Sequence, residues 1–477
     1  LLSHFDLRTS ENYLIDKSGL SSLLDIEIGV IEKLLEYFSL NFSELEGRKH
    51  EFFFLDNPIW LKPIISTGED YYCVLPQLFF SYVLGALDGL VEQFDKDALH
   101  DRRASYLESK IESIVKTRFP DSHIVAGVEW VFNGVEYETD LVAFIDSHAI
   151  IFEAKSHKIS APALRGAPRR IKRHLEEVFI EPAVQSYRFE QKLNGLMTGG
   201  AADDQLLSKI PVDIGDIKKV LRVSVSLEDF ATLQTNLELI KDTGWLPQDF
   251  TPCPTINLAD LETLFDFLEH PVQIIHYLSR RTELFGKYNV FGDELDYMGF
   301  YATTLLNMGN LDEAGGMIAL TNMSKPLDRY YISRDQGIHI DKPQPAISPW
   351  FKEIFDTLEE RATPRWTEIG GILNHFAPDN QVDISKGIKT LARRVQKHWK
   401  TDGHENTLIF SPPASSKYAL AVVLYKNENS ERRHEFFENA AAWGLEPEHV
   451  QYCLIIGLNI DARDLPYHYI ALAEPPK

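Results

Sequence analysis

The sequence is poor in cysteine and lacks long apolar runs. Three cysteines, Cys73, Cys253 and Cys453, lie far apart, with no CxxC pair and no Cys/His cluster. A disulfide framework and a four-ligand structural zinc site are therefore not expected, and the reducing cytoplasm is the expected compartment. No apolar run approaches the roughly 20 residues that cross a bilayer, so we expect no membrane partner. No secretory signal peptide is visible either.

A net positive charge is also lacking. Lys plus Arg is 48 and Asp plus Glu is 71, which gives a formal net charge of −23 over 477 residues. This charge argues against a protein whose whole surface binds nucleic acid or anionic lipid, but it leaves room for a local basic groove. Hydrophobic residues make up 44% of the chain, enough for more than one buried core.

The patterning predicts an α/β multidomain protein. We expect a mixed N-terminal accessory domain over 1–100, a central domain over 101–235, a helical region over 236–340 and a small C-terminal α/β domain over 341–477. The central domain has the clearest order, α-β-β-β-α-β. Its expected elements are the helix 104–118, the strands 124–132, 137–145 and 149–155, the helix 181–196 and the strand 219–227.

The third of these central strands carries the chemistry. Side chains alternate along a strand, so Glu153 and Lys155 share a face. A two-residue turn at Ser147–His148 would put Asp140 opposite Lys155 and diagonal to Glu153, within about 8 Å. Two carboxylates, with a backbone carbonyl such as that of Ala154, can hold Mg²⁺, and a neighbouring lysine can orient water or stabilise negative charge.

The E-x-K pattern alone is weak, because it occurs three times. It is found at Glu108–Lys110, Glu153–Lys155 and Glu190–Lys192. Only the second copy lies in an apolar strand that follows a strand with an aspartate. The alternative is an exposed surface ion pair. The run Ala149–Phe152 is too apolar for a solvated edge, and charges within such a run need partners or a metal.

The Asp140 … Glu153-Ala-Lys155 signature and the order of elements resemble the PD-(D/E)xK nuclease superfamily in its restriction-endonuclease-like form. The chain is most similar to bacterial nuclease-related domains in which E-x-K precedes a basic linker. The resemblance covers roughly residues 100–230, and Thr139 stands where the family name has proline. It implies an Mg²⁺- or Mn²⁺-dependent nuclease, with Asp140 and Glu153 binding the metal and Lys155 serving the attacking water.

The resemblance also implies two further site residues. Family members often add a metal-binding glutamate from the first helix. Glu108 fits this role best, with Glu112 as its rival one turn later, and the alternative is a solvated helix charge. Related nucleases place a glutamine on the helix after E-x-K, which corresponds to Gln185; Phe189 stands where some relatives have tyrosine. The alternative for Gln185 is a helix-surface amide.

A basic segment follows the E-x-K strand. From Lys155 to Arg173 the chain contains no Asp or Glu, which suits contact with a phosphate backbone. The alternative is a solvated loop that pairs with acidic surface. His157 and His174 are expected to be bystanders. The candidate nucleic-acid-binding residues are Lys158, Arg165, Arg169, Arg170 and Arg173.

Three functions remain open. The first is a metal-dependent hydrolase that cleaves nucleic acid, with DNA as the expected substrate and defence against foreign DNA as the role that the resemblance implies. The second is a catalytically silent nuclease fold used for binding or scaffolding. The third is an unrelated α/β interaction protein in which the Asp-Glu-Lys trio is coincidental. The flanking domains are expected to serve target choice, autoinhibition, or contact with a second copy or a protein partner.

Overall fold

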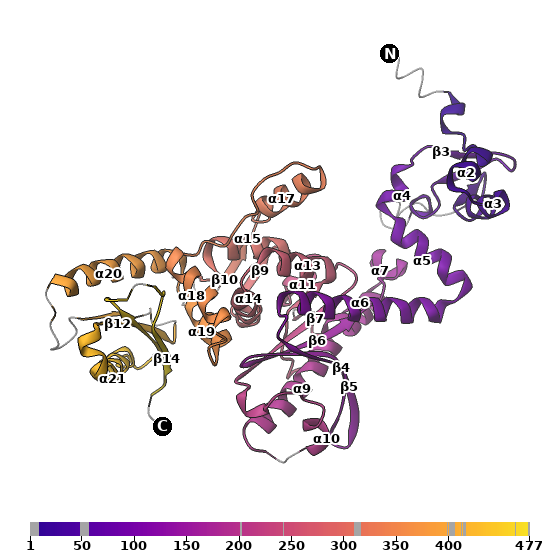
Figure 1. Cartoon of the computed structure of the whole chain (residues 1–477). Coiled ribbons are helices and arrows are strands. Elements are labelled where there is room, and N and C mark those ends of the chain that lie inside the picture. Colours follow the sequence, from indigo (N-terminus) through magenta and orange to yellow (C-terminus); the bar gives the residue numbers. More distant parts are fainter. Residues whose placement is uncertain are drawn as a thin grey trace. The chain divides into compact units, whose positions relative to one another are not determined.

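The structure is a computed structural model. It describes residues 9–47, 57–200, 203–241, 243–309, 316–397, 399, 406–411, 413, 416–462 and 464–475. The chain forms two compact units. The first comprises Leu1–Tyr106 and Lys158–Leu175, and the second comprises Leu107–His157 and Glu176–Lys477. The chain is mixed α/β, as predicted (Figure 1).

The first unit contains a small three-stranded sheet and short helices. Strand β2 pairs with β1 in parallel and with β3 in antiparallel orientation. A tight turn joins β2 to β3: Gly68 has φ +98°, and the Thr67 N–H donates to the Asp70 carbonyl. The elements of this unit are η1 (Ser10–Tyr13), α2 (Lys17–Leu24), α3 (Ile28–Tyr37), β1 (Ser39–Asn41), η2 (Pro58–Trp60), β2 (Ile64–Ser66), β3 (Tyr71–Cys73), α4 (Gln77–Ser81), α5 (Val83–Phe94), α7 (Ala161–Leu164) and α8 (Pro168–Leu175).

A five-stranded sheet dominates the second unit. Its order is β4-β5-β6-β7-β8, with antiparallel pairing from β4 to β6 and parallel pairing from β6 to β8. The predicted order of the main elements is confirmed, and β8 is an addition to it. The elements are the part of α6 (Lys96–Arg118) from Leu107 onward, β4 (His123–Phe132), β5 (Val135–Ile145), β6 (His148–Lys155), the π-helical turn η3 (Glu176–Ile180), α9 (Glu181–Met197), α10 (Asp204–Leu207), η4 (Ile214–Asp216), β7 (Lys219–Ser226) and β8 (Thr255–Asn257).

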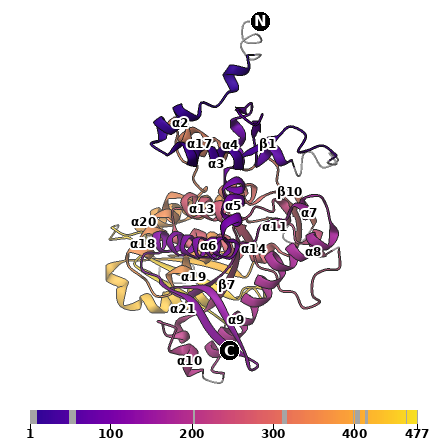
Figure 2. The same ribbon diagram turned by 90° about the vertical axis from the view of Figure 1, so that its right-hand side faces the viewer.

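Both faces of this sheet are covered. Leu107 and Ile111 of α6 pack in one hydrophobic cluster with Phe152, whereas Phe189 and Leu193 of α9 pack in another. The helices α6 and α9 lie on opposite sides of β7 (Figure 2). Strand β6 is therefore buried on both sides, which explains why its sequence is almost continuously apolar.

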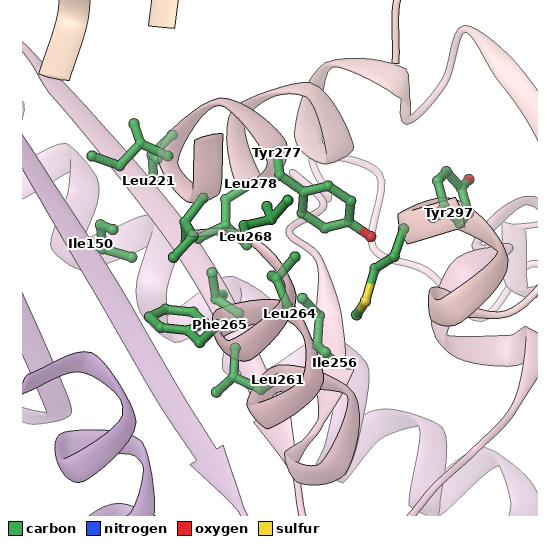
Figure 3. Close-up of a cluster of buried hydrophobic side chains, with 14 of the residues drawn as sticks. Ile150, Leu221, Ile256, Leu261, Leu264, Phe265, Leu268, Tyr277, Leu278 and Tyr297 are labelled. Atoms are coloured by element: carbon green, nitrogen blue, oxygen red, sulfur yellow. The ribbon is translucent and has the colours of Figure 1, made fainter. Parts of the chain in front are cut away.

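The first of these clusters continues well beyond residue 235. Ile150 of β6 and Leu221 of β7 meet Leu264 and Tyr277 in one core (Figure 3). The segment predicted as a separate helical region thus shares a core with the sheet. Its elements are α11 (Thr232–Thr235), α12 (Glu238–Lys241), α13 (Leu258–Phe267), α14 (Pro271–Leu284), β9 (Tyr288–Phe291), α15 (Glu294–Thr304), β10 (Gly316–Ala319) and α17 (Lys325–Asp335).

A second sheet, β11-β12-β13-β14, lies near the C-terminus. This segment combines helices and strands, as predicted for the C-terminal part of the chain. The helix α19 packs closely on α14. A Cβ added at Gly370 would lie only 2.3 Å from Val272 Cγ1, which shows how near the two helices approach. The elements are α18 (Pro349–Glu360), α19 (Trp366–Asn374), α20 (Pro378–Lys397), β11 (Thr407–Phe410), β12 (Tyr418–Tyr425), η6 (Asn427–Arg432), α21 (Arg433–Gly444), β13 (Tyr452–Asn459) and β14 (Tyr469–Ala473).

Two features of composition have structural counterparts. Cys73, Cys253 and Cys453 are all free thiols, and the last two are buried. Across the described ranges, no helix combines the length and the apolar character that a membrane crossing would require.

Candidate active site

The β5–β6 hairpin carries the predicted site, but its turn differs from the prediction. Ile145 pairs with His148, so the two-residue turn is Asp146–Ser147 rather than Ser147–His148. Asp146 adopts φ +48°, a conformation that aspartate tolerates better than most residues. Its carboxylate also accepts hydrogen bonds from the backbone N–H groups of Arg365 and Thr367. These distant contacts fix a register that local sequence could not reveal.

The register changes the neighbours of Asp140. The ladder ends with Leu141 opposite Phe152, so the next position along it sets Asp140 beside Glu153, not opposite Lys155 as predicted. Asp140 is unpaired in the β4 ladder as well. Instead, its Oδ2 accepts a 2.6 Å hydrogen bond from the backbone N–H of Ala154. This bond ties the middle of β5 to the end of β6 and directs the carboxylate toward the E-x-K residues.

The three predicted residues nevertheless converge. Lys155 Nζ lies 4.0 Å from Asp140 Oδ2 and 3.8 Å from Glu153 Oε2. The predicted clustering within about 8 Å is therefore confirmed. The lysine side chain is 17% exposed and Asp140 is 22% exposed, so both groups can still be reached from solvent. Glu153 is fully buried behind them.

Glu153 has unusual surroundings for a buried carboxyl group. Its side chain is 0% exposed, and neither carboxylate oxygen has a hydrogen-bond partner among the described residues. Burial raises its pKa well above the usual range, and the negative charge of Asp140 adds to the shift, while Lys155 opposes it. A buried ionised carboxylate without hydrogen bonds is costly. A cation between Glu153 and Asp140 would remove that cost.

Glu108 lies within electrostatic reach of this cluster. Burial raises its pKa, and Asp140 and Glu138 raise it further, while Lys155 lowers it. Glu108 and Glu112 are both exposed, and no described interaction links Glu112 to the cluster. The pKa shift of Glu108 is consistent with the choice of Glu108 over Glu112, which stays a prediction. In the part of the chain that the structure describes, no group of three or more His, Cys, Asp or Glu side chains is already arranged to hold a metal ion.

Gln185 connects α9 to the same place. Its Nε2 donates a 2.5 Å hydrogen bond to the backbone carbonyl of Glu138 on β5. Glu138 was not among the predicted residues, although its charge acts on both Glu108 and Glu153. The available signal was a second carboxylate two positions before Asp140. Phe189, by contrast, is 0% exposed and stacks near Trp130 in the core.

A buried arginine holds α9 against the sheet. Arg222 of β7 pairs with Glu190 Oε2 at 2.7 Å and donates to the Ala183 carbonyl at 3.0 Å. Both partners belong to α9, the helix that presents Gln185. Its Nη2 also donates to the Pro252 carbonyl at 3.1 Å. Arg222 is thus a positioning residue for this side of the site.

The three E-x-K copies differ in the partners of their charged side chains. In the third copy, Glu190 pairs with Arg222 and Lys192 pairs with Asp203 at 2.7 Å. In the first copy, Lys110 pairs with Glu262 at 3.4 Å. Only the second copy combines a lysine with a buried carboxylate that lacks hydrogen bonds.

The basic residues that follow Lys155 in the predicted nucleic-acid-binding segment belong to the first unit. Arg165, Arg169, Arg170 and Arg173 are exposed. Lys158 Nζ lies 2.6 Å from Asp88 Oδ2, which also binds Arg103 at 2.7 Å. Ser160 contacts His174 Nε2 through its backbone N–H and hydroxyl. Lys158 is thus half-buried and engaged in an ion pair, whereas the four arginines lie at the surface.

Comparison of the chain with protein-family models, with curated protein sequences and with solved structures returned no match.

Proposed function

We propose that the chain is a metal-dependent nuclease of the PD-(D/E)xK type that hydrolyses phosphodiester bonds in DNA. The observation that carries the proposal is the buried Glu153 carboxylate, which has no hydrogen-bond partner and lies beside Asp140 and Lys155. The α-β-β-β-α-β order of the surrounding elements also supports it. Defence against foreign DNA and a cytoplasmic location belong to the same proposal.

The available donors fit a hard divalent cation. Asp140 and Glu153 would hold Mg²⁺ or Mn²⁺, with Glu108 as the third carboxylate, because such ions prefer carboxylate oxygens. The bound ion would polarise the phosphate and lower the pKa of a coordinated water. Both oxygens of Glu153 lack a hydrogen-bond partner, which suits a metal-binding carboxylate better than a purely structural one.

The protein's own groups supply the remaining steps. Lys155, about 4 Å from both carboxylates, can stabilise the negative charge that develops on the phosphate and orient the attacking water. Gln185 holds β5 in place two residues before Asp140, through the carbonyl of Glu138. The hydrolysis consumes one water and yields a phosphate monoester and a hydroxyl group.

Cleavage assays on four substrates test the activity. Supercoiled plasmid, linear duplex DNA, single-stranded DNA and RNA are incubated with the purified chain, with and without Mg²⁺ or Mn²⁺. We expect metal-dependent nicking of DNA, loss of activity in Asp140→Asn, and full activity in Asp383→Asn, an exposed aspartate on α20. The proposal fails if no substrate is cut, or if Asp140→Asn keeps full metal-dependent activity.

A second candidate is a catalytically silent nuclease fold that binds nucleic acid. The absence, in the described residues, of a complete three-ligand metal group favours it. Binding of duplex DNA in Ca²⁺ without turnover in Mg²⁺ or Mn²⁺ would select this candidate.

A salt titration tests the nucleic-acid contacts under both candidates. Replacing Arg169, Arg170 and Arg173 by Ala should weaken binding to every sequence and flatten the salt dependence by up to about 3 units, since each phosphate contact contributes about −0.9. The matched control replaces three exposed bases of α20, Lys386, Lys389 and Arg393. Equal effects in both triple variants would refute a specific role for the arginines.

A further inference from the structure

The second unit contains a cavity of about 460 Å³ that is separate from the candidate active site. It lies between the end of α14, the junction of α19 with α20, and the beginning of β12. Its size is within the range of pockets that hold small molecules. Charged groups line it from α14 and β12, and aromatic rings line it from β11, β12 and the α19–α20 junction.

The cavity and Lys155 lie near opposite ends of strand β7. Lys219, the first residue of β7, bonds Ser279 of α14, and its Nζ lies 3.8 Å from the Glu283 carboxylate that lines the cavity. Ser226, the last residue of β7, pairs with Lys155. The eight residues of β7 span about 23 Å at roughly 3.3 Å per residue. A ligand in this cavity would therefore not occupy the candidate active site.

Positive charge is in excess around the cavity. Three cations line it, Arg280, Lys287 and Lys417, against one carboxylate, Glu283. Glu283 is already neutralised, because Arg280 binds it at 2.8 Å. Burial alone would raise the pKa of Glu283, but Lys219 and Arg280 together lower it, so the group stays ionised. Neither Lys287 nor Lys417 forms an ion pair with a carboxylate of the described chain.

The surplus charge also acts on His375. Burial lowers its pKa well below the usual range, and Arg280, Lys219 and Lys417 lower it further. His375 is therefore a neutral ring in a positive field. On a chain with a net charge of −23, a lined cavity with surplus cations is a specific local feature that favours an anion.

Aromatic rings supply the second half of the site. The His375 ring lies 4.6 Å from that of Tyr418 at an interplanar angle of 31°, and Tyr418 stacks on Tyr452 at 5.6 Å. Lys417 Nζ lies 5.3 Å from the centre of the Tyr418 ring. Phe410 is half-buried and meets Phe376 edge to face. Cations beside aromatic rings are the combination that binds a phosphate together with a planar base.

We propose that this cavity is a binding site for a nucleotide. Lys287 and Lys417 would bind the phosphate, and the rings of Phe410 and Tyr418 would contact the base. The proposal does not depend on nuclease activity, since the residues that it uses are separate from Asp140, Glu153 and Lys155. A site for a simple inorganic anion would use the lysines but would not need the rings.

Calorimetric titration of the full chain tests the proposal. The probes are AMP, GMP, CMP and UMP, with inorganic phosphate and adenosine as comparisons, all in EDTA so that no metal bridges a ligand to the carboxylates. We expect at least one nucleotide to bind with a stoichiometry of one and more tightly than phosphate or adenosine. No nucleotide binding, or phosphate binding as tight as nucleotide binding, would overturn the proposal.

Variants test the two halves of the site separately. Lys287→Ala with Lys417→Ala should weaken nucleotide binding by about tenfold or more, because two charge-assisted contacts are lost. The control, Lys386→Ala with Lys389→Ala, removes two exposed lysines of α20 and should leave affinity unchanged. Phe410→Leu keeps an apolar side chain and should weaken nucleotide but not phosphate binding. Thermal unfolding confirms that each variant is folded. Equal affinity in the Lys287/Lys417 variant and its control would place the nucleotide elsewhere.

Discussion

Two buried carboxylates of the second unit, Glu153 and Glu294, have opposite surroundings. Glu294 is 2% exposed and accepts hydrogen bonds from Arg281 Nε at 3.0 Å and Nη2 at 2.8 Å, and from the Tyr277 hydroxyl. Arg281 also lies 3.9 Å above the ring of Tyr297. Glu153 is 0% exposed, its nearest cation is 3.8 Å away, and its oxygens accept no described hydrogen bond.

The difference separates a structural ion pair from a ligand-binding group. A buried charge that is fully paired belongs to the framework, and removing its partner leaves an uncompensated charge. A buried carboxylate with unused oxygens stores an unfavourable energy that a bound cation can relieve. The E-x-K pattern marks Glu153 in the sequence, but only the neighbours of the two glutamates show which oxygens are already used.

The largest expected effect is on the structural pair. Arg281→Met should lower the free energy of unfolding of the second unit by about 3–5 kcal/mol, because Glu294 loses its buried partner. Denaturant titration measures the loss. The control is Arg334→Met, an exposed arginine 3.8 Å from Asp335, which should change stability by at most about 1 kcal/mol. A similar small change in Arg281→Met would contradict a structural role for the pair.

Removing the ammonium group of Lys155 near Glu153 should affect catalysis rather than stability. Lys155→Ala should slow metal-dependent cleavage by about 10²–10³-fold, as expected when one transition-state donor is lost. Stability should change little, because Glu153 can take up a proton. Lys192→Ala, which removes a lysine paired with Asp203, serves as the control and should retain activity. Full activity in the Lys155 variant would assign the chemistry to other residues.

The raised pKa of Glu153 predicts a pH dependence without metal. Its carboxyl binds a proton more readily in the folded protein than in the unfolded chain, where the ordinary value is 4.5. The free energy of unfolding should therefore fall as pH rises from 4.5 toward the raised folded value, by on the order of 1.4 kcal/mol per unit of pKa shift. Denaturation in EDTA between about pH 4 and 8 should show a smaller loss in Glu153→Gln than in the native chain, because Asp260, whose pKa burial raises to about 7, titrates in both proteins.

The control for this titration is Glu446→Gln, which changes an exposed glutamate. Its curve should run parallel to that of the native chain. If the curves of Glu153→Gln and Glu446→Gln coincide, the Glu153 carboxyl does not titrate as its burial requires.

The smallest expected effect is stabilisation by the ion itself. At about five times its dissociation constant, Mg²⁺ or Mn²⁺ should add about 1 kcal/mol to the free energy of unfolding. Thermal unfolding should show the corresponding rise in Tm in the native chain and in Asp383→Asn. The rise should be absent in Asp140→Asn and Glu153→Gln. An equal rise in all four proteins would mean that the ion binds away from Glu153.

Much of the central sheet could be predicted because its signals are local. The predicted strands 124–132, 137–145 and 149–155 agree with β4, β5 and β6 within a few residues of their observed bounds. Strand β8 was missed because it has only three residues, Thr255–Asn257, and joins the sheet through parallel pairing with β7. Its place depends on a partner about thirty residues earlier, not on its own pattern.

The site was predictable only in part, for a similar reason. Glu153 and Lys155 lie on one strand, so spacing alone related them. The position of Asp140 depended on the hairpin register, which Asp146 sets through contacts with Arg365 and Thr367. The contact of Gln185 with the Glu138 carbonyl likewise joins residues 47 positions apart. Short-range patterns could not show either contact.

The hydrogen bonds between Thr367 and the Asp146 carboxylate have a consequence for folding during synthesis on the ribosome. The two residues are 221 positions apart. Translation adds about 5–20 residues per second, so roughly 10–40 s pass between the synthesis of the β5–β6 hairpin and the synthesis of Thr367. During that interval the nascent hairpin and its apolar strand β6 lack part of their final packing. A segment 221 residues downstream of Asp146 thus governs how long the apolar strand β6 must be shielded after it emerges.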